Sequence, residues 1–399
     1  MEKKCVVVGI TGGIAAYKAA QLVSNLSKKY EVHVIMTKNA CEFVTPLTFE
    51  TLSHNRTIVD MFDRHFEYHT EHISLAKKAD AFVIAPASAN VIAKIAHGIA
   101  DDMLTTNFLA CSKPKIIAPA MNTGMLENPI TQENIAKLKE FGMTIVESGK
   151  GLLACGDVGS GRLAELEDIE DAIEYALHLD KPLLGKKLLV SAGPTQESLD
   201  PVRYITNHSS GKQGYAIAKA AAAMGAEVTL VSGPSQVHTP WNVSKINVTS
   251  ANEMGRAILA ISPEFDFIIK SAAVADYTPE SVSDQKIKKS DDDLSIPLKR
   301  TTDILAALGK IKGEKQILCG FAMESENLLE NAKSKLTRKN ADMIVANTIT
   351  GENAAFGVDS NKVFLLTKDE ELALPTLSKE KLSYVILYKL LELANKVGE

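Results

Sequence analysis

The stretch CVVVGITGGIAAYKAAQLVSNLSKKYEVHVIM, residues 5–36, decides the fold class of this chain. Its first residues, Cys5 to Ile10, form a short apolar run that is typical of a buried strand. Gly12 and Gly13 follow, and apolar residues then recur at helical spacing at Ala15, Ala19, Leu22, Val23 and Leu26. A second apolar run occupies residues 32–36. Strand, glycine turn, helix and strand in this order predict a parallel βαβ unit.

The same alternation continues along the chain and predicts the domain organisation. In the first half, further strands are expected at residues 81–85, 115–118 and 143–147. The pattern breaks at Asp180-Lys181-Pro182 and restarts with strands at 188–192 and 227–232 around an alanine-rich helix at 215–224. Later strands are expected at 267–271, 317–321, 343–346 and 363–366, before a helix at 379–396. We therefore predict two Rossmann-like, doubly wound α/β domains, residues 1–185 and 186–399.

Composition excludes several classes of function. The 399 residues are 45% hydrophobic and 23% charged, which is ordinary for globular domains. The net charge of −5, without a basic stripe, argues against a nucleic-acid partner. No apolar run is long enough to span a bilayer, so we expect no membrane partner. The five cysteines include no CxxC pair, which argues against a disulfide framework or zinc site and favours the reducing cytoplasm.

Two glycine-containing loops are candidate phosphate sites. Gly12 and Gly13 lie between a strand and a helix, where unpaired backbone N–H groups attract anions. The spacing is not that of a dinucleotide fingerprint, so a mononucleotide such as FMN fits as well, and a simple tight turn fits equally. The second loop, NHSSGKQG at residues 207–214, gathers two hydroxyls and a lysine before the alanine-rich helix. Its density of donors favours a binding function over a plain turn.

Longer strings then combine into a resemblance. The first half contains GITGGIAAYK (9–18), PASAN (86–90), PAMN (119–122), LACG (153–156) and Gly159-x-Gly161-Arg162. The second half contains GPT (193–195), DPVR (200–203), NHSSG (207–211), AAVAD (272–276), KIKK (286–289) and GFA (320–322). From about residue 5 to 395 the chain resembles the bacterial bifunctional phosphopantothenoylcysteine decarboxylase/phosphopantothenate–cysteine ligases of coenzyme A biosynthesis. The first half is similar to flavodoxin-like, flavin-dependent cysteine decarboxylases.

For the first half, the resemblance implies FMN-dependent decarboxylation of phosphopantothenoylcysteine to 4′-phosphopantetheine. Cys155 would be the proton donor, in a glycine-rich segment that is typical of a mobile flap. The residues alone do not choose among His65, His69 and His72, whereas the resemblance selects His72. It also implies that Asn122 holds the substrate carboxylate and that FMN is bound by Gly12, Gly13, Ser88 and Asn90. Leu126 departs from the tryptophan that the family often has there.

For the second half, the resemblance implies ligation of cysteine to 4′-phosphopantothenate through an acyl-cytidylate made from CTP. Asn207 and Lys286 would be catalytic, Arg203 would bind substrate, and Mg²⁺ would be held mainly by the nucleotide phosphates. Physical reasoning does not choose CTP over ATP. The CTP-binding positions implied are Asp276, Lys286, Thr302, Asp303, Ile304, Leu305, Phe321, Lys335 and Lys339.

The resemblance also implies an assembly, and two other classes of function stay open. Family members suggest a homododecamer built from decarboxylase trimers and ligase dimers. One alternative is a flavin- or nucleotide-binding oxidoreductase that uses both halves for a single reaction. The other is a regulatory binding protein that has lost one activity. The presence of Cys155, His72, Asn207 and Lys286 argues against that second alternative.

Overall fold

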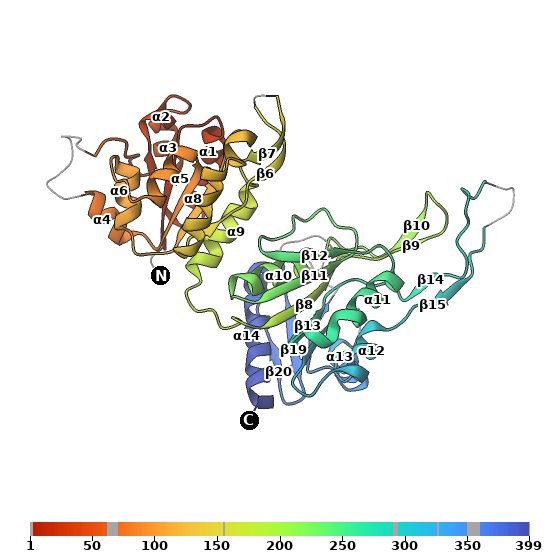
Figure 1. Cartoon of the computed structure of the whole chain (residues 1–399). Coiled ribbons are helices and arrows are strands. Elements are labelled where there is room, and N and C mark those ends of the chain that lie inside the picture. The colour runs from red at the N-terminus through yellow and green to blue at the C-terminus, as the bar shows by residue number, and fades with distance from the viewer. Residues whose placement is uncertain are drawn as a thin grey trace. The chain divides into compact units, whose positions relative to one another are not determined.

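The computed structural model describes residues 3–61, 71–154, 156–289, 294–324, 327–348 and 360–398 (Figure 1). The chain divides into two compact units, residues 1–179 and 180–399. Leu183 is 1% exposed and packs in the core of the second unit. The backbone N–H of Leu183 donates to the Met224 carbonyl at 3.1 Å. The boundary predicted at residue 185, with an activity on each side of it, stays a prediction.

The first unit is built on a five-stranded parallel sheet in the order β2-β1-β3-β4-β5. The strands are β1 (Cys5–Ile10), β2 (Glu31–Met36), β3 (Ala81–Ala87), β4 (Lys115–Pro119) and β5 (Thr144–Ile145). β1 and β3 are buried along their whole length, as continuous apolar strands of a covered parallel sheet should be. The fifth strand is shorter than the predicted 143–147. The doubly wound α/β class of this unit is confirmed.

Helices connect these strands, and one hairpin was not predicted. The helices are α1 (Ala16–Ser27), α2 (Lys38–Cys41), α3 (Pro46–Ser53), α4 (Glu71–Lys78), α5 (Ala89–Ala96), α6 (Met103–Ala110), α7 (Thr123–Leu126), α8 (Pro129–Glu140) and α9 (Leu166–Leu177). In α1 the buried stripe begins at Ala16 rather than at the predicted Ala15, because Ala15 is the N-cap residue. The glycine-rich segment folds as an antiparallel hairpin of β6 (Gly149–Leu152) and β7 (Val158–Arg162).

The second unit has an eight-stranded sheet in the order β12-β11-β8-β13-β16-β17-β19-β20. Its strands are β8 (Lys187–Ala192), β11 (Glu227–Ser232), β12 (Val243–Asn247), β13 (Phe267–Lys270), β16 (Ile317–Glu324), β17 (Met343–Thr348), β19 (Val363–Thr367) and β20 (Glu371–Ala373). The strands from β12 to β17 run parallel in the Rossmann order, whereas β19 and β20 add an antiparallel edge. The predicted doubly wound class is confirmed, with this antiparallel edge as an addition.

Helices cover both faces of the second sheet (Figure 1). One core lies under α10 (Lys212–Ala223) and α14 (Lys379–Gly398), and the other under α11 (Ala251–Ile261), α12 (Ile304–Ile311) and α13 (Leu328–Arg338). Neighbouring residues of β13 face opposite cores, Ile269 the first and Ile268 the second. Short elements extend from the sheet: β9 (Gln196–Ser198), β10 (Tyr204–Thr206), η1 (Ser262–Glu264), β14 (Tyr277–Pro279), β15 (Leu298–Arg300), β18 (Ser360–Asn361) and β21 (Leu377–Ser378). No helix among the described residues is both long and apolar enough to cross a membrane.

Candidate active sites at the carboxyl edges of the two sheets

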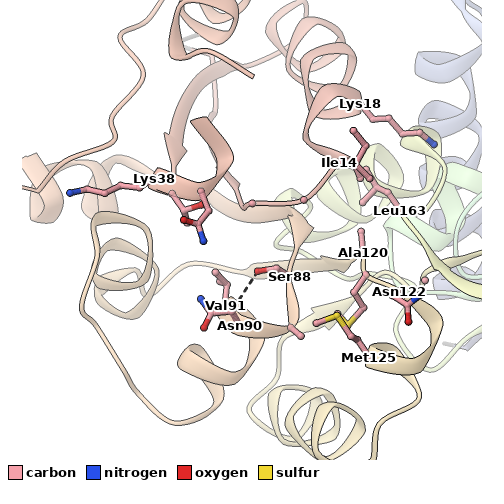
Figure 2. Close-up of a pocket in the computed structure, with 18 of the residues that line it drawn as sticks. Ile14, Lys18, Lys38, Ser88, Asn90, Val91, Ala120, Asn122, Met125 and Leu163 are labelled. Carbon is pink, nitrogen blue, oxygen red and sulfur yellow. Dashed lines mark hydrogen bonds between the residues drawn. The ribbon is translucent and has the colours of Figure 1, made fainter. Parts of the chain in front are cut away.

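A cavity of about 1160 Å³ lies at the carboxyl edge of the first sheet. The strand order reverses between β1 and β3, and open α/β sheets bind ligands outside the carboxyl ends of their strands at such a point. The loops after β1, β2, β3 and β4 all contribute lining residues (Figure 2). The structure brings five of the seven predicted site residues of this half together, because the cavity is lined by Gly12, Gly13, Ser88, Asn90 and Asn122.

The two glycines of the first loop have different surroundings. A Cβ atom on Gly12 would lie 2.4 Å from the Cβ of Asn39, so this position has no room for a side chain. A Cβ atom on Gly13 would meet nothing within 4 Å, and this backbone lies open to the cavity. Thr11 ties the loop to the one after β3, because its hydroxyl donates to the Pro86 carbonyl at 2.7 Å and accepts from the Ser88 N–H at 2.9 Å. The loop therefore offers bare backbone at the start of α1.

The start of α5 forms a second polar wall of the cavity. Ser88 is its N-cap, and its hydroxyl accepts from the Val91 N–H at 3.5 Å (Figure 2). Asn90 lies in the first turn and also faces the cavity. Ser88 thus has a structural role at the helix terminus, beside the flavin contact that the sequence predicts.

Sequence reasoning missed an ion-pair cluster on the cavity wall. The Lys94 ammonium lies 2.6 Å from an Asp101 oxygen and 3.2 Å from an Asp102 oxygen, and all three residues line the cavity. The hydrogen bond to Asp101 raises the pKa of Lys94, although burial opposes it. Asp102 also caps α6 by accepting the Thr105 N–H at 2.8 Å. The Asp-x-x-Thr spacing is a capping signal that could have located this helix start.

Asn122 joins the end of β4 to the hairpin. Its Oδ1 accepts the Gly124 N–H at 2.9 Å, and its Nδ2 donates to an Asp157 oxygen at 3.4 Å. The Met121 N–H donates to the Gly161 carbonyl at 2.9 Å. Gly161 has φ +120°, and a Cβ there would lie 2.1 Å from the Met121 carbonyl oxygen, so glycine is required for this contact. The glycines of the predicted flap therefore serve to seat a β-hairpin against Asn122; its mobility stays a prediction.

Two predicted catalytic residues fall outside this description. Cys155 lies outside the described residues, although Leu153 and Ala154 before it line the cavity. His72 belongs to α4, but its side chain lies outside the described part of the chain. Leu126, which departs from the family pattern, is only 8% exposed and packs in the core.

In the second sheet the strand order reverses between β8 and β13, and Asn207 lies at the carboxyl edge of the sheet there. Its Nδ2 donates to the carbonyls of Ala273 and Val274 at 3.3 and 3.2 Å. The Thr195 hydroxyl accepts the Ala275 N–H at 3.0 Å and joins the same two loops. The predicted donor amide is thus held against backbone carbonyls, which fixes the orientation of Asn207 at the sheet edge.

The predicted phosphate loop is packed closely at the start of α10. A Cβ on Gly214 would lie 2.6 Å from the Ala192 Cβ, so helix and strand approach too closely for a side chain. Gly211 is the N-cap residue, with φ +78°. The Ser209 hydroxyl accepts the Gly211 N–H at 3.3 Å. This hydroxyl is used to shape the loop, and the backbone at the helix start carries the anion-binding potential.

Arg203 is part of an ion pair. Its Nε and Nη2 donate to one Asp200 oxygen at 3.0 and 2.6 Å, and Nη2 also donates to the Ile287 carbonyl at 2.7 Å. The Arg203 guanidinium holds the pKa of the Asp200 carboxyl far below its usual range. Arg203 therefore fastens the segment that carries the exposed Lys286. Its predicted substrate contact stays a prediction.

The remaining predicted positions gather around the start of α12. Asp303 caps the helix by accepting the Ala306 N–H at 2.9 Å, and its other oxygen accepts from the Lys339 ammonium. The Lys335 ammonium donates to the Phe321 carbonyl at 2.8 Å.

Asp276 and Thr302, before α12, are exposed, whereas the first residues of α12 are buried. The Asp276 carbonyl accepts the Thr301 N–H at 2.9 Å, next to Thr302. Ile304 and Leu305 are only 3% and 7% exposed and pack in the core, and their contact with a nucleotide stays a prediction. Among the described residues, no group of three or more His, Cys, Asp and Glu side chains is placed to hold a metal ion.

Fold and site together define an α/β protein with two separate ligand edges, the first flavodoxin-like and the second Rossmann-like. Residues 1–178 match the family model described as Flavoprotein, and residues 183–393 match that described as DNA/pantothenate metabolism flavoprotein C-terminal domain. The chain is 45% identical to the coenzyme A biosynthesis bifunctional protein CoaBC of Bacillus subtilis (strain 168), over 100% of this chain and 99% of that relative.

A second relative belongs to the same family, and one solved structure is similar in part. The CoaBC protein of Vibrio parahaemolyticus serotype O3:K6 (strain RIMD 2210633) is 46% identical over 98% of both chains. The crystal structure of the C-terminal domain of a CoaBC protein is 42% identical and covers 54% of this chain and 100% of that chain, with a TM-score of 0.47. The chain therefore belongs to the family of bifunctional CoaBC proteins of coenzyme A biosynthesis. The prediction of a bifunctional enzyme that joins a flavoprotein decarboxylase half to a ligase half is confirmed.

Proposed function

We propose that this enzyme first joins cysteine to 4′-phosphopantothenate at the expense of CTP, and then decarboxylates the product to 4′-phosphopantetheine with FMN. Residues 186–399 carry the ligation and residues 1–185 the decarboxylation. The observation that carries the proposal is the cavity at the β1/β3 switch point. Five residues chosen from sequence strings far apart in the chain, from Gly12 to Asn122, line it together.

The residues around this cavity fit FMN. The open backbone at Gly13 and the N-terminus of α1 offer N–H groups to a phosphate. The cavity volume exceeds what a drug-sized ligand needs, which leaves room for a substrate beside a flavin. Ser88 and Asn90 would contact the flavin from the start of α5. FMN supplies a reversible two-electron acceptor, chemistry that no protein side chain provides.

The protein's own residues would bind the substrate and move protons. Asn122 has its Oδ1 fixed by the Gly124 N–H, so its Nδ2 points in a defined direction and can exchange the Asp157 carboxylate for that of the substrate. Cys155 would donate the proton that completes the product, since a thiol with a pKa of about 8.5 is a reasonable acid near neutral pH. His72 would receive the substrate's thiol proton.

In the second half, the substrate carboxylate would attack the α-phosphorus of CTP, and pyrophosphate would leave. The cysteine amine would then attack the acyl carbonyl, and CMP would leave. Lys286, Lys335 and Lys339 would offset the phosphate charge, with Mg²⁺ held mainly by the phosphates. Asn207 would contact the acyl-cytidylate. Its bonds to two backbone carbonyls would hold the side chain in one orientation for that contact. Arg203 would add a substrate contact, and the other nucleotide contacts would come from Asp276, Thr302 to Leu305 and Phe321.

The proposed assembly is a homododecamer of decarboxylase trimers and ligase dimers, and the proposed location is the cytoplasm. Free cysteines at positions 5, 41, 111 and 319 are compatible with a reducing compartment. Sedimentation velocity of the purified protein measures the assembly directly, and a monomer at micromolar concentration would contradict it.

One coupled assay tests the activities. The protein is incubated with phosphopantothenate, cysteine, CTP and Mg²⁺, and the products are identified by mass spectrometry. We expect phosphopantetheine, pyrophosphate and CO₂. Cys155→Ser should still bind FMN and release CO₂, but should accumulate the oxidised enethiol, because a hydroxyl is a far weaker acid than a thiol. A normal yield of phosphopantetheine from this variant would contradict the role of Cys155.

A further inference from the structure

Lys270 is a buried lysine that the proposed mechanism does not use. It ends β13, next to the switch point of the second sheet, and pairs in register with Ser191 of β8 and Gly320 of β16. It shares a sheet face with Ile268, which packs under α11, α12 and α13. Only 8% of the residue is exposed. A lysine so deeply buried is rare unless it is paired.

Among the residues that the structure describes, no oxygen accepts a hydrogen bond that would compensate this burial. The Lys270 ammonium makes its hydrogen-bond contact with the thioether sulfur of Met254, at 3.8 Å. Lys270 makes no ion pair with a carboxylate in the part of the chain that the structure describes. Burial lowers the pKa of Lys270 to about 7, while Asp303 raises it and Lys335 lowers it. Among the described residues, the charged groups that act on Lys270 are thus Asp303 at the start of α12 and Lys335 of α13, and α11 contributes Met254.

Both charged neighbours belong to the predicted nucleotide positions. Asp303 is at present held by the Lys339 ammonium, and Lys335 by the Phe321 carbonyl. If Lys335 and Lys339 bind nucleotide phosphates, the Asp303 carboxylate loses its partner and the positive charge of Lys335 is offset. Asp303 already acts on the charge of Lys270, so a released Asp303 carboxylate favours the charged form of this buried amine.

We propose that Lys270 is a positioning residue of the nucleotide site, which takes up a proton when phosphates engage Lys335 and Lys339 and then serves as the counter-ion of Asp303. The inference rests on the proposed nucleotide site. All three electrostatic changes have the same sign, because an arriving anion, a released Asp303 and a neutralised Lys335 each favour the charged form of Lys270. Nucleotide binding therefore draws protons from solvent near neutral pH.

The experiment is calorimetric titration of CTP and Mg²⁺ into the full-length protein, in buffers of different ionisation enthalpy. Lys270→Met keeps the length and fits the apolar surroundings, and Lys270→Gln is a second variant. Lys310→Met, on the exposed side of α12, is the matched control. Proton uptake by the nucleotide itself cancels in the difference between wild-type and variant protein.

With a pKa of about 7, wild-type protein should take up as much as about half a proton more than Lys270→Met at pH 7. The difference should grow toward about one proton at pH 8 and shrink to about a tenth at pH 6, where Lys270 is already charged. Lys310→Met should follow the wild-type curve.

Two results overturn the inference, and they are distinguishable. Equal uptake by wild-type protein and both Lys270 variants, with CTP still bound, would show that Lys270 is only structural and would leave the nucleotide site intact. Absence of CTP binding by wild-type protein would remove the nucleotide site and, with it, the role of Lys270.

Discussion

The switch point of the first sheet and that of the second hold different kinds of group. In the first unit, Gly13 leaves backbone bare, and polar side chains such as Ser88 cap helices around an open cavity. In the second unit, the candidate residues hold one another or the backbone, as Arg203 holds Asp200 and Lys339 holds Asp303. The flavin part of the first site is thus shaped before any ligand arrives, whereas the candidate residues of the second site must exchange internal bonds for ligand bonds.

The largest effect that sharpens this comparison is expected for Asn207→Asp. The change is nearly isosteric, but it replaces the donor to the Ala273 and Val274 carbonyls with a negative charge. The proposed contact of this amide with the acyl-cytidylate would also be lost; losing one donor oriented on a reacting group costs about 10²–10³ in rate, and repulsion of phosphate adds to the loss. Synthesis of phosphopantothenoylcysteine should collapse.

The decarboxylation of supplied phosphopantothenoylcysteine by the same variant is the control. It should stay near the wild-type rate, since the cavity lies in the other unit. A parallel fall of both activities would mean that Asn207 is structural or that the units are coupled.

The next prediction distinguishes the roles of two neighbouring glycines, Gly12 and Gly13. In Gly13→Ala the new methyl meets only open space, so thermal stability should stay the same. The methyl would stand where the FMN phosphate is proposed to approach this backbone. FMN affinity should therefore fall at least about tenfold, because hydrogen bonds to a charged phosphate are worth about 1.5–3 kcal/mol each. In Gly12→Ala the methyl would collide with Asn39, and unfolding free energy should fall by about 1–3 kcal/mol.

Calorimetry measures the stability of each variant, and flavin fluorescence measures its affinity for FMN. Gly313→Ala, in the second unit and also facing open space, is the matched control. Unchanged flavin binding by Gly13→Ala would mean that the cavity does not hold FMN through this loop.

The last effect concerns pH. Lys270 has a folded pKa of about 7, below its unfolded value of about 10.4. Between these values the unfolded chain binds more protons, so the stability of the second unit should rise with pH by up to about 1.4 kcal/mol per unit. Chemical unfolding at pH 7, 8 and 9 should show this rise in wild-type protein but not in Lys270→Met. Parallel curves would contradict the burial of an unpaired amine.

The sequence predicted the architecture well because burial patterns are local. Apolar runs such as Cys5–Ile10 located the main strands, and the glycine turn placed α1. The β6–β7 hairpin escaped prediction because its glycines serve a long-range contact, that of Gly161 with Met121, which has no local signature. The antiparallel edge also depends on tertiary pairing.

The candidate sites were predicted unevenly for the same reason. Gly12, Ser88 and Asn122 each follow a strand end, so their convergence at one edge is a consequence of the parallel sheet. The bond of Arg203 to the Ile287 carbonyl joins segments far apart in sequence, and no spacing in the sequence predicts it. Lys270 was missed because one lysine at the end of an apolar strand is indistinguishable from an exposed residue.

The central claim, that each unit carries a complete site, is tested most directly by expressing residues 1–179 and 180–399 separately. The second fragment should begin at residue 180, because the buried Leu183 belongs to its core, and a fragment that begins at 186 should be about 2–5 kcal/mol less stable. We predict that 180–399 converts phosphopantothenate, cysteine and CTP to phosphopantothenoylcysteine without releasing CO₂, and that 1–179 binds flavin and decarboxylates that product. Folded fragments that are inactive apart, beside an active full-length enzyme, would contradict the claim.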